Sequence, residues 1–226
     1  MNNTFASGFV AEHLTLALQT PYIIGVGGCS ASGKTALAVL LAKYFNNTIP
    51  IISLDWFYKP IDPSYGPTHN WDSPTAFDWT RVLATLSGLK NGKSQWVPRH
   101  DYVTYARIEN VELIESSPVI LFEGIFALLN RDVNRLLDMK LYIECDTDVA
   151  LKRRIVRDMS VRGYDLTTIL ERYETQVKPA FDTWIYPTRK YATFIIHNNG
   201  NDGIENHGSV KELKTLIRSK LGMIRR

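Results

Sequence analysis

The sequence predicts an α/β fold, a mostly parallel β-sheet covered by helices on both faces. Short apolar runs alternate along the chain with longer segments of helical spacing, which is the pattern of the strand and helix units that build a parallel sheet. Residues 118–124 and 139–145 are almost continuously apolar, as strands are when helices cover both faces of a sheet. The glycine-rich segment 27–35 joins a strand-like run to a helix-like one, as in the first unit of such a fold.

Each element follows from local signals. We expect strands at 22–28, 49–55, 118–124, 139–145 and 193–197, and helices at 34–45, 73–92, 146–163 and near 209–221, with a further helix-rich stretch to about residue 190. For the helix 73–92, Ser73 is a possible N-cap, Pro74 suits the first turn and Gly92 lies beyond the end. The stretches 56–72 and 92–116 are the least regular, and we expect these loops to carry specificity.

Length and composition favour one globular domain. The chain has 226 residues, of which 45% are hydrophobic and 22% charged. We predict a single domain over 1–226, with a core of 22–200, an N-terminal extension of 1–20 and a C-terminal helix within 203–226.

Several partners and compartments are not expected. The formal net charge of +3 gives no reason to expect nucleic-acid binding. We also expect no membrane association, because no apolar run reaches the roughly 20 residues of a membrane span. Residues 1–20 lack the basic start of a secretory signal. Because the chain has only two cysteines, Cys29 and Cys145, and a disulfide inside the segment 27–35 would be awkward, we expect a reducing, cytoplasmic location.

Residues 28–35, GCSASGKT, match the phosphate-binding pattern G-x-x-x-x-G-K-[ST] without a gap. In this pattern backbone N–H groups turn inward around an anion, and the following helix adds its dipole. We expect Lys34 to face the outer phosphates and the Thr35 hydroxyl to contact Mg²⁺. All eight residues are therefore predicted to bind a nucleotide: Gly28, Cys29, Ser30, Ala31, Ser32, Gly33, Lys34 and Thr35. The fold is predicted to be of the P-loop NTPase type.

The motif predicts nucleotide binding but does not identify the reaction, because motors, switches and kinases all share it. A GTP switch normally needs an Asn-Lys-x-Asp motif, which is absent from the sequence. A single-domain chain of this length is most often a kinase of a small molecule. Such an enzyme needs a base near the accepting hydroxyl, a carboxylate beside the metal and arginines over the moving phosphoryl group.

Two carboxylates follow predicted strands at the sheet edge where ligands of open α/β sheets gather. Asp55 ends the second strand and is our candidate for the general base and for a metal contact, although a lone aspartate there often only caps a loop. Glu123 ends the strand 118–124 and is our candidate for the Mg²⁺-side acid.

Four arginines, Arg153, Arg154, Arg157 and Arg162, lie on or just after the helix 146–163. Arg154 and Arg157 are three residues apart and share a face. Basic residues on a helix are more often a solvated face. Downstream of a P-loop they also indicate an arginine-rich helical lid that closes on phosphates.

Several segments resemble the uridine-cytidine kinases, in the same order: GGCSASGKT, SLDWFYKP, NWDSPTAFDW, VILFEGIFAL, LKRRIVRDMSVRG and QVKPAFDTWIYPTRKYATFII. The resemblance spans about residues 22–200. It implies transfer of the γ-phosphoryl group of ATP to the 5′-hydroxyl of a pyrimidine ribonucleoside, with Mg²⁺, and a homotetramer.

The resemblance also implies residue roles. Asp55 is similar to the family's general base and Lys34 keeps the role above, with Arg157 and Arg162 on the phosphates. Asp72 matches a carboxylate that accepts hydrogen bonds from the ribose hydroxyls. The remaining implied contacts are Tyr58 and Arg154 with the nucleoside, Trp71 as an aromatic pocket candidate, and Asn201 or Asp202 beside the adenine.

Four positions depart from the family pattern: His100 replaces a usual tyrosine, Tyr105 a histidine, Tyr164 an arginine and Arg172 a glutamine. They are expected to face the nucleoside. Imidazole and phenol can each donate and accept hydrogen bonds, so the choice between uracil and cytosine stays open.

Two alternative functions remain. One keeps the scaffold and changes the acceptor to another ribonucleoside, or to a sugar or vitamin alcohol. The other is a nucleotide-binding regulator that has lost catalysis.

Overall fold

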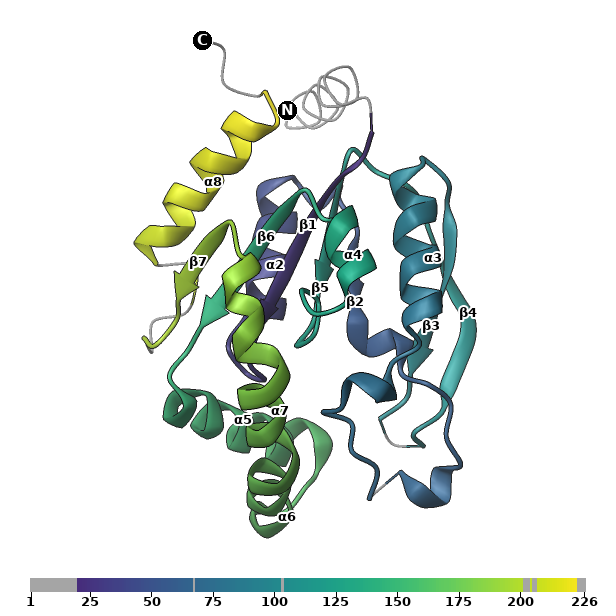
Figure 1. Ribbon diagram of the computed structural model, residues 1–226, viewed down its shortest axis with the longest axis vertical. Coiled ribbons are helices and arrows are strands. Elements are labelled where there is room, and N and C mark those ends of the chain that lie inside the picture. The colour runs from purple at the N-terminus through teal and green to yellow at the C-terminus, as the bar shows by residue number, and fades with distance from the viewer. Residues whose placement is uncertain (1–19, 67, 103, 201–203, 205–206, 223–226) are drawn as a thin grey trace, which may run out of the picture.

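A computed structural model describes residues 20–66, 68–102, 104–200, 204 and 207–222. Its centre is a five-stranded parallel sheet in the order β2-β5-β1-β6-β7. The strands are β1 (Tyr22–Gly28), β2 (Ile51–Ser53), β5 (Val119–Glu123), β6 (Met139–Glu144) and β7 (Phe194–His197). Helices lie on both sides of this sheet (Figure 1). The predicted α/β class is confirmed, including the strand and helix that flank the P-loop.

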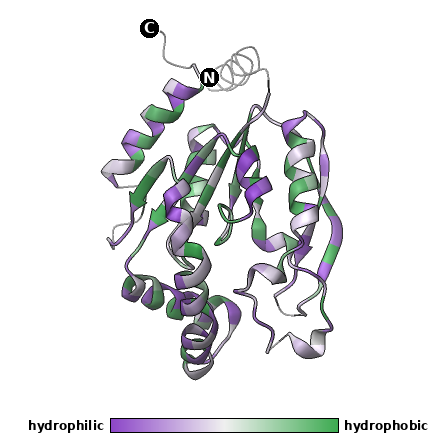
Figure 2. Ribbon diagram, in the orientation of Figure 1, coloured by the Kyte–Doolittle hydropathy of each residue, from purple (hydrophilic) through white to green (hydrophobic). Residues whose placement is uncertain are grey.

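The helices are α2 (Lys34–Tyr44), α3 (Trp79–Lys90), α4 (Arg131–Leu136), α5 (Thr147–Arg162), α6 (Leu166–Arg172), α7 (Lys178–Ala180) and α8 (Gly208–Lys220). Alternate residues of β1 enter two separate cores. Ile24 packs with residues of α2 and α8, and its neighbour Ile23 packs with residues of α3 and α4. The sheet is therefore apolar on both faces. The strands carry hydrophobic residues in the hydropathy colouring of Figure 2.

The predicted start of the helix 73–92 is wrong, because helix α3 begins at Trp79. Ser73 does cap a turn, but that turn is a short 3₁₀ segment, Pro74–Ala76, and the chain then extends through the fully buried Phe77. A second cap follows, because Asp78 Oδ1 accepts a hydrogen bond of 3.0 Å from the Arg81 N–H. Helix α3 begins only after this second cap.

An antiparallel hairpin of β3 (Gln95–His100) and β4 (Arg107–Ile114) occupies the stretch 92–116, which the sequence left irregular. Most of β4 is exposed, so it carries no apolar run that would announce a strand. The hairpin packs beside α3 at one side of the molecule (Figure 1) and its tip reaches toward the carboxyl ends of the sheet strands.

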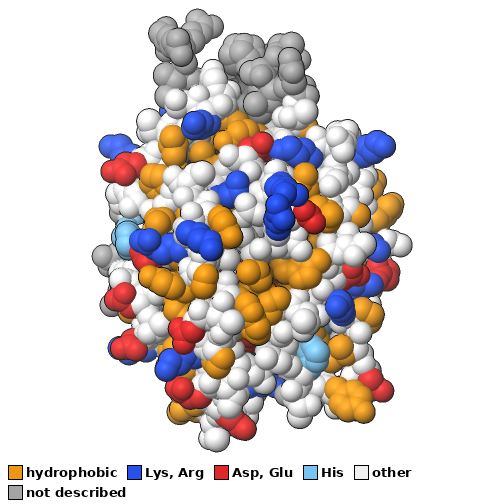
Figure 3. Space-filling view, in the orientation of Figure 1, with side chains coloured by type: hydrophobic (Ala, Val, Ile, Leu, Met, Phe, Trp, Pro, Cys, Tyr) orange, Lys and Arg blue, Asp and Glu red, His pale blue; other side chains and the backbone are white. Residues whose placement is uncertain are grey.

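On the face seen in Figure 3, acidic and basic side chains are interspersed, and hydrophobic side chains gather near its centre. Among the described residues no helix is both long and apolar enough to cross a membrane.

Candidate active site

The P-loop follows β1 and opens α2. Lys34 Nζ donates a hydrogen bond of 2.7 Å to the Cys29 carbonyl, which folds the side chain back over the loop. Gly33 has a φ of 102°, and a Cβ atom there would lie 2.6 Å from Asn198 Nδ2. That amide in turn donates to the Ser32 carbonyl at 2.7 Å. The loop geometry therefore requires glycine at position 33 and is supported by the residue after β7.

A cavity of about 370 Å³ lies beside the P-loop. Three groups that the sequence analysis predicted for the chemistry, Lys34, Asp55 and Glu123, line this cavity together. Asp55 lies in the 3₁₀ turn after β2, and Glu123 is the last residue of β5. Strands β2 and β5 are parallel neighbours, with Ser53 paired to Glu123. Their carboxyl ends therefore bring both carboxylates to the same edge of the sheet.

Glu123 is surrounded by oxygen donors. Its Oε1 accepts hydrogen bonds from Ser53 Oγ at 2.9 Å and from Thr35 Oγ1 at 3.4 Å. Burial raises the pKa of Glu123, and the nearby Asp55 raises it further, while Lys34 opposes the shift. Burial likewise lowers the pKa of Lys34, opposed chiefly by Glu123. Burial thus disfavours the charged form of both groups, and their mutual attraction works against it.

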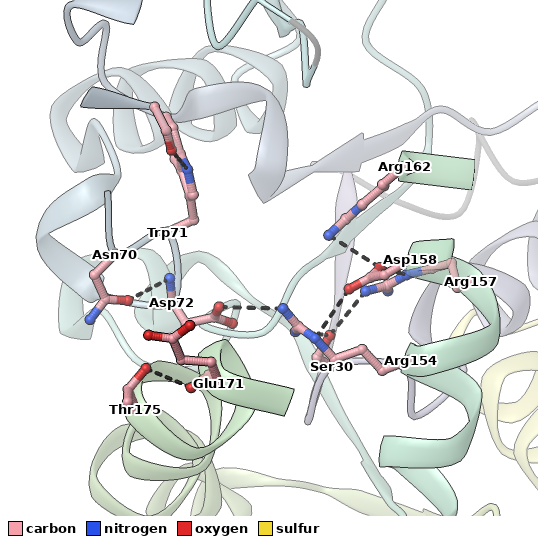
Figure 4. Close-up of polar contacts among 11 residues, drawn as sticks. Ser30, Asn70, Trp71, Asp72, Arg154, Arg157, Asp158, Arg162, Glu171 and Thr175 are labelled. Atoms are coloured by element: carbon pink, nitrogen blue, oxygen red, sulfur yellow. Dashed lines mark hydrogen bonds and ion pairs between the residues drawn. The ribbon is translucent and has the colours of Figure 1, made fainter. Parts of the chain in front are cut away.

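Asp158 organises the arginines of α5. Its carboxylate is almost fully buried and forms ion pairs with Arg154 Nε at 3.2 Å, Arg157 Nε at 2.8 Å and Arg162 Nη1 at 3.4 Å. Figure 4 shows the three guanidinium groups converging on this residue. Asp158 thereby holds the three arginines together at the wall of the cavity that they line.

The arginine helix also contacts the P-loop directly. Ser30 Oγ accepts a hydrogen bond of 3.0 Å from Arg154 Nη1 and one of 3.5 Å from Arg157 Nη2 (Figure 4). Arg154 Nη2 also lies 3.8 Å from Asp72 Oδ2 on the opposite wall of the cavity. Arg154 therefore bridges the P-loop and the loop that carries Asp72. Burial raises the pKa of Asp72, although Arg154 works against the shift.

An aromatic wall faces these charged groups. Trp71 stacks nearly parallel to Tyr105, with ring centroids 5.8 Å apart, and meets Tyr58 edge-on at 4.9 Å. His100 packs against Tyr58 at 5.0 Å, and its buried Nδ1 has no hydrogen-bond partner among the described residues. Burial lowers the pKa of His100, so its imidazole is neutral at pH 7 and Nδ1 can take either role in a hydrogen bond. Tyr58, Trp71, His100 and Tyr105 together line one part of the cavity, which we call the aromatic slot.

Two further departures from the family pattern lie at the mouth of this slot. The Tyr105 and Tyr164 hydroxyls lie near each other and near Arg172, whose positive charge opposes the rise in the Tyr105 pKa that burial causes. The Arg172 guanidinium also lies 4.6 Å from the centre of the Tyr164 ring. The loop between β3 and β4 is thus tied to the segment after α5.

Most predicted site residues line this one cavity: Ser30, Ala31, Gly33, Lys34, Thr35, Asp55, Tyr58, Trp71, Asp72, His100, Tyr105, Glu123, Arg154, Arg157, Arg162, Tyr164 and Arg172. The side chains of Cys29 and Ser32 are buried and do not line it, nor does Gly28. Cys29 instead packs beside Cys145, and both are free thiols. The predicted adenine contacts, Asn201 and Asp202, lie outside the described residues.

Among the residues that sequence reasoning missed are Ser53, Tyr102, Asp158 and Gln176. Tyr102 and Gln176 line the cavity, Ser53 binds Glu123, and Asp158 pairs with the arginines. A signal was available for Asp158, because it lies four residues from both Arg154 and Arg162, the spacing of ion pairs on a helix.

Comparison with known proteins finds one family. The family described as Phosphoribulokinase / Uridine kinase family matches residues 23–205. Uridine-cytidine kinase B of Dictyostelium discoideum is 38% identical over 217 residues, which cover 94% of this chain and 88% of that protein. Uridine-cytidine kinase A of the same organism is 36% identical over 206 residues. That match covers 90% of this chain but only 40% of the longer relative.

Among solved structures, phosphoribulokinase from Rhodobacter spheroides superimposes with a TM-score of 0.60 at 14% identity. The superposition covers 78% of this chain and 70% of that one. At this identity the likeness concerns the fold.

Proposed function

The chain belongs to the phosphoribulokinase/uridine kinase family, and on that premise we propose that it transfers the γ-phosphoryl group of ATP to the 5′-hydroxyl of uridine, cytidine or both. One observation carries the proposal: Lys34 of the P-loop and the carboxylate of Asp55 line the same cavity as the aromatic slot. A nucleoside in the slot and a triphosphate on the P-loop would meet between these two groups.

In this mechanism the phosphoryl group moves in line from ATP to the nucleoside. Asp55 accepts the proton of the 5′-hydroxyl as its oxygen attacks the γ-phosphorus. Lys34, Arg157 and Arg162 stabilise the charge on the transferring group, and the arginine helix excludes water when it closes. Asp72 accepts hydrogen bonds from the ribose hydroxyls, and Trp71 packs against the base.

The residues at the sheet edge fit Mg²⁺. The Thr35 hydroxyl and the carboxylates of Glu123 and Asp55 are hard oxygen donors, and a bound cation would favour the charged form of Glu123 that burial disfavours. When bound, the ion would compensate the charge of the triphosphate. Thr35 and Glu123 would hold it against the P-loop, with Asp55 on the side of the nucleoside.

The first test is Asp55→Asn. If Asp55 is the general base, kcat falls roughly 10²–10⁴-fold, whereas ATP still raises the melting temperature of the protein. Asp62→Asn is the matched control, since Asp62 lies exposed in the following loop and contacts Ser64. Near-normal turnover by Asp55→Asn would remove Asp55 from the role of base.

A coupled ADP assay with a panel of acceptors tests the substrate class. Uridine and cytidine are expected to be turned over, and their 2′-deoxy forms less well, because a ribose hydroxyl missing opposite the buried Asp72 leaves an acceptor unpaired. Turnover of a sugar or vitamin alcohol in place of these nucleosides would overturn the proposal. Nucleotide binding without any turnover would instead indicate a regulator.

A further inference from the structure

Tyr102 is not among the residues that the sequence analysis expected to act in the reaction, yet it contacts the centre of the site. It lies in the loop between β3 and β4. Although 42% of its surface is exposed, its hydroxyl reaches inward and donates a hydrogen bond of 3.2 Å to Asp55 Oδ2. The bond joins segments far apart in the sequence, and its acceptor is the carboxylate that we propose as the general base.

The ring of Tyr102 contacts two more groups of the site. The Arg162 guanidinium lies 5.0 Å from the ring centre, at the end of α5. The His100 ring meets it edge-on, with centroids 5.1 Å apart and planes at 86°. Tyr102 thus contacts Asp55, the proposed general base, as well as Arg162 of helix α5 and His100 of the aromatic slot.

A general base is effective only when one oxygen is held near the proton it must remove. A free aspartate rotates about its terminal bond, which is broad and roughly two-fold. A hydrogen bond from a phenol to a carboxylate is charge-assisted and opposes that rotation. With Oδ2 bound by Tyr102, Oδ1 stays free of this bond and available to the acceptor hydroxyl.

We propose that Tyr102 is a positioning residue for phosphoryl transfer, which orients Asp55 by binding Oδ2 and aligns it with Arg162 of the lid. This inference rests on the proposed function. In the step, the bond from the 5′-oxygen to the γ-phosphorus forms as the bond from that phosphorus to the β,γ-bridging oxygen breaks. The electron pair leaves with ADP, and the hydroxyl proton passes to Asp55 Oδ1. Tyr102 keeps its own proton throughout.

The experiment begins with Tyr102→Phe, which removes one oxygen and keeps the ring contacts with Arg162 and His100. The expected result is a roughly tenfold fall in kcat, the size of one lost hydrogen bond. The KM values for nucleoside and ATP should stay within about twofold, because the lost contact acts on the base and not on bound substrate. Tyr65→Phe is the matched control, since Tyr65 is 65% exposed and its side chain does not line the cavity.

A double-mutant cycle separates positioning from other effects. If Tyr102 acts through the carboxylate, Tyr102→Phe should change kcat less than twofold when Asp55 is already alanine. An equal loss in both backgrounds would overturn the proposal, as would an unchanged kcat in the single variant or a loss that appears only in KM.

The two proposals fail in different ways. If the enzyme is active and Asp55→Asn has a normal kcat, Asp55 is not the general base and Tyr102 has no positioning role. A strong effect of Asp55→Asn beside a silent Tyr102→Phe would refute the positioning role alone. Melting temperatures of all variants, measured without ligand, show whether any loss is one of folding.

Discussion

A single carboxylate, Asp158, lies beside three arginines in the interior of the site. It is 1% exposed, and each arginine contacts one of its two oxygens. One negative charge near three positive ones leaves the group cationic, which suits a surface meant to meet phosphates. The carboxylate thus holds the geometry of the arginines without cancelling their charge.

Asp158→Asn is therefore expected to affect both stability and turnover. The change removes a buried charge that accepts a hydrogen bond from Arg157 and forms ion pairs with Arg154 and Arg162, which should lower the free energy of unfolding by about 1–3 kcal/mol. It should also raise the KM for ATP and lower kcat, as the arginines lose their orientation. Denaturant unfolding and steady-state kinetics measure the two effects. Asp148→Asn, on an exposed site of the same helix, should cost less than about 1 kcal/mol and leave turnover unchanged.

Asp72 gives a pH-dependent prediction. Burial raises its pKa, so the folded protein favours its protonated form more than the unfolded chain does. This contribution stabilises the fold at low pH and is lost as the pH rises through the raised, folded-state pKa. Asp72→Asn should therefore raise the melting temperature of the ligand-free protein at pH 7, and the gain should shrink as the pH falls toward 4. A gain that grows on acidification would contradict this.

The same variant should weaken the reaction that we propose. Kinetics with uridine and 2′-deoxyuridine should show a lower kcat/KM for the ribonucleoside and a smaller preference over the deoxy form. A gain in stability bought by a loss of function is the usual mark of a site residue.

The sequence predicted the residues that belong to a motif or end an apolar strand. It did not predict residues that act by contacting another side chain of the site. Lys34 and Thr35 belong to a contiguous motif, and Glu123 ends an apolar strand. Tyr102 could not be found in this way, because its contact with Asp55 depends on the hairpin, which the sequence did not reveal.

At the scale of elements, helix α5 determines where the lid arginines lie. It ends at Gly163, whose φ of 70° is left-handed, and the following Tyr164 N–H bonds back to the Asp158 carbonyl at 3.1 Å. The turn directs the chain toward Tyr164, which meets Tyr105 across the mouth of the slot.

Gly163→Ala should strain this turn. A side chain in the left-handed region costs about 1–2 kcal/mol, although no atom lies within 4 Å of the added Cβ. Thermal or denaturant unfolding measures the loss, and the KM for nucleoside should rise as Tyr164 shifts. Gly208→Ala is the control: its Cβ also meets nothing within 4 Å, but its φ is not left-handed, so stability should rise by up to about 1 kcal/mol. Equal effects of the two variants would refute the strain.

The sequence pattern predicted the strands that are buried on both faces, but it did not predict the exposed hairpin. Strands β5 and β6 are apolar runs because helices cover both of their faces. Strand β4 faces solvent along most of its length and lacks that signal. Helix α3 was misplaced at its start because two competing caps, Ser73 and Asp78, lie five residues apart and only packing of Phe77 decides between them.

For the whole molecule, the family resemblance predicts a homotetramer. Large apolar side chains are exposed on α5 and on the hairpin, among them Val156, Val161, Trp96 and Leu113. Exposed apolar surface of this kind often marks contacts between proteins. Light scattering should therefore give a mass near four times the 25.7 kDa of one chain. The mass of a single chain at micromolar concentration would contradict it.

The strand order has a consequence for synthesis. Strand β1, which ends in the phosphate loop, pairs with β5 and β6 and with neither β2 nor the hairpin, so its partners are residues 119–123 and 139–143. As the ribosome releases the chain, this apolar segment has no strand partner until residues 119–123 have been made. The growing polypeptide thus carries an unprotected aggregation-prone strand, and chaperone dependence should be greatest before residue 144 emerges.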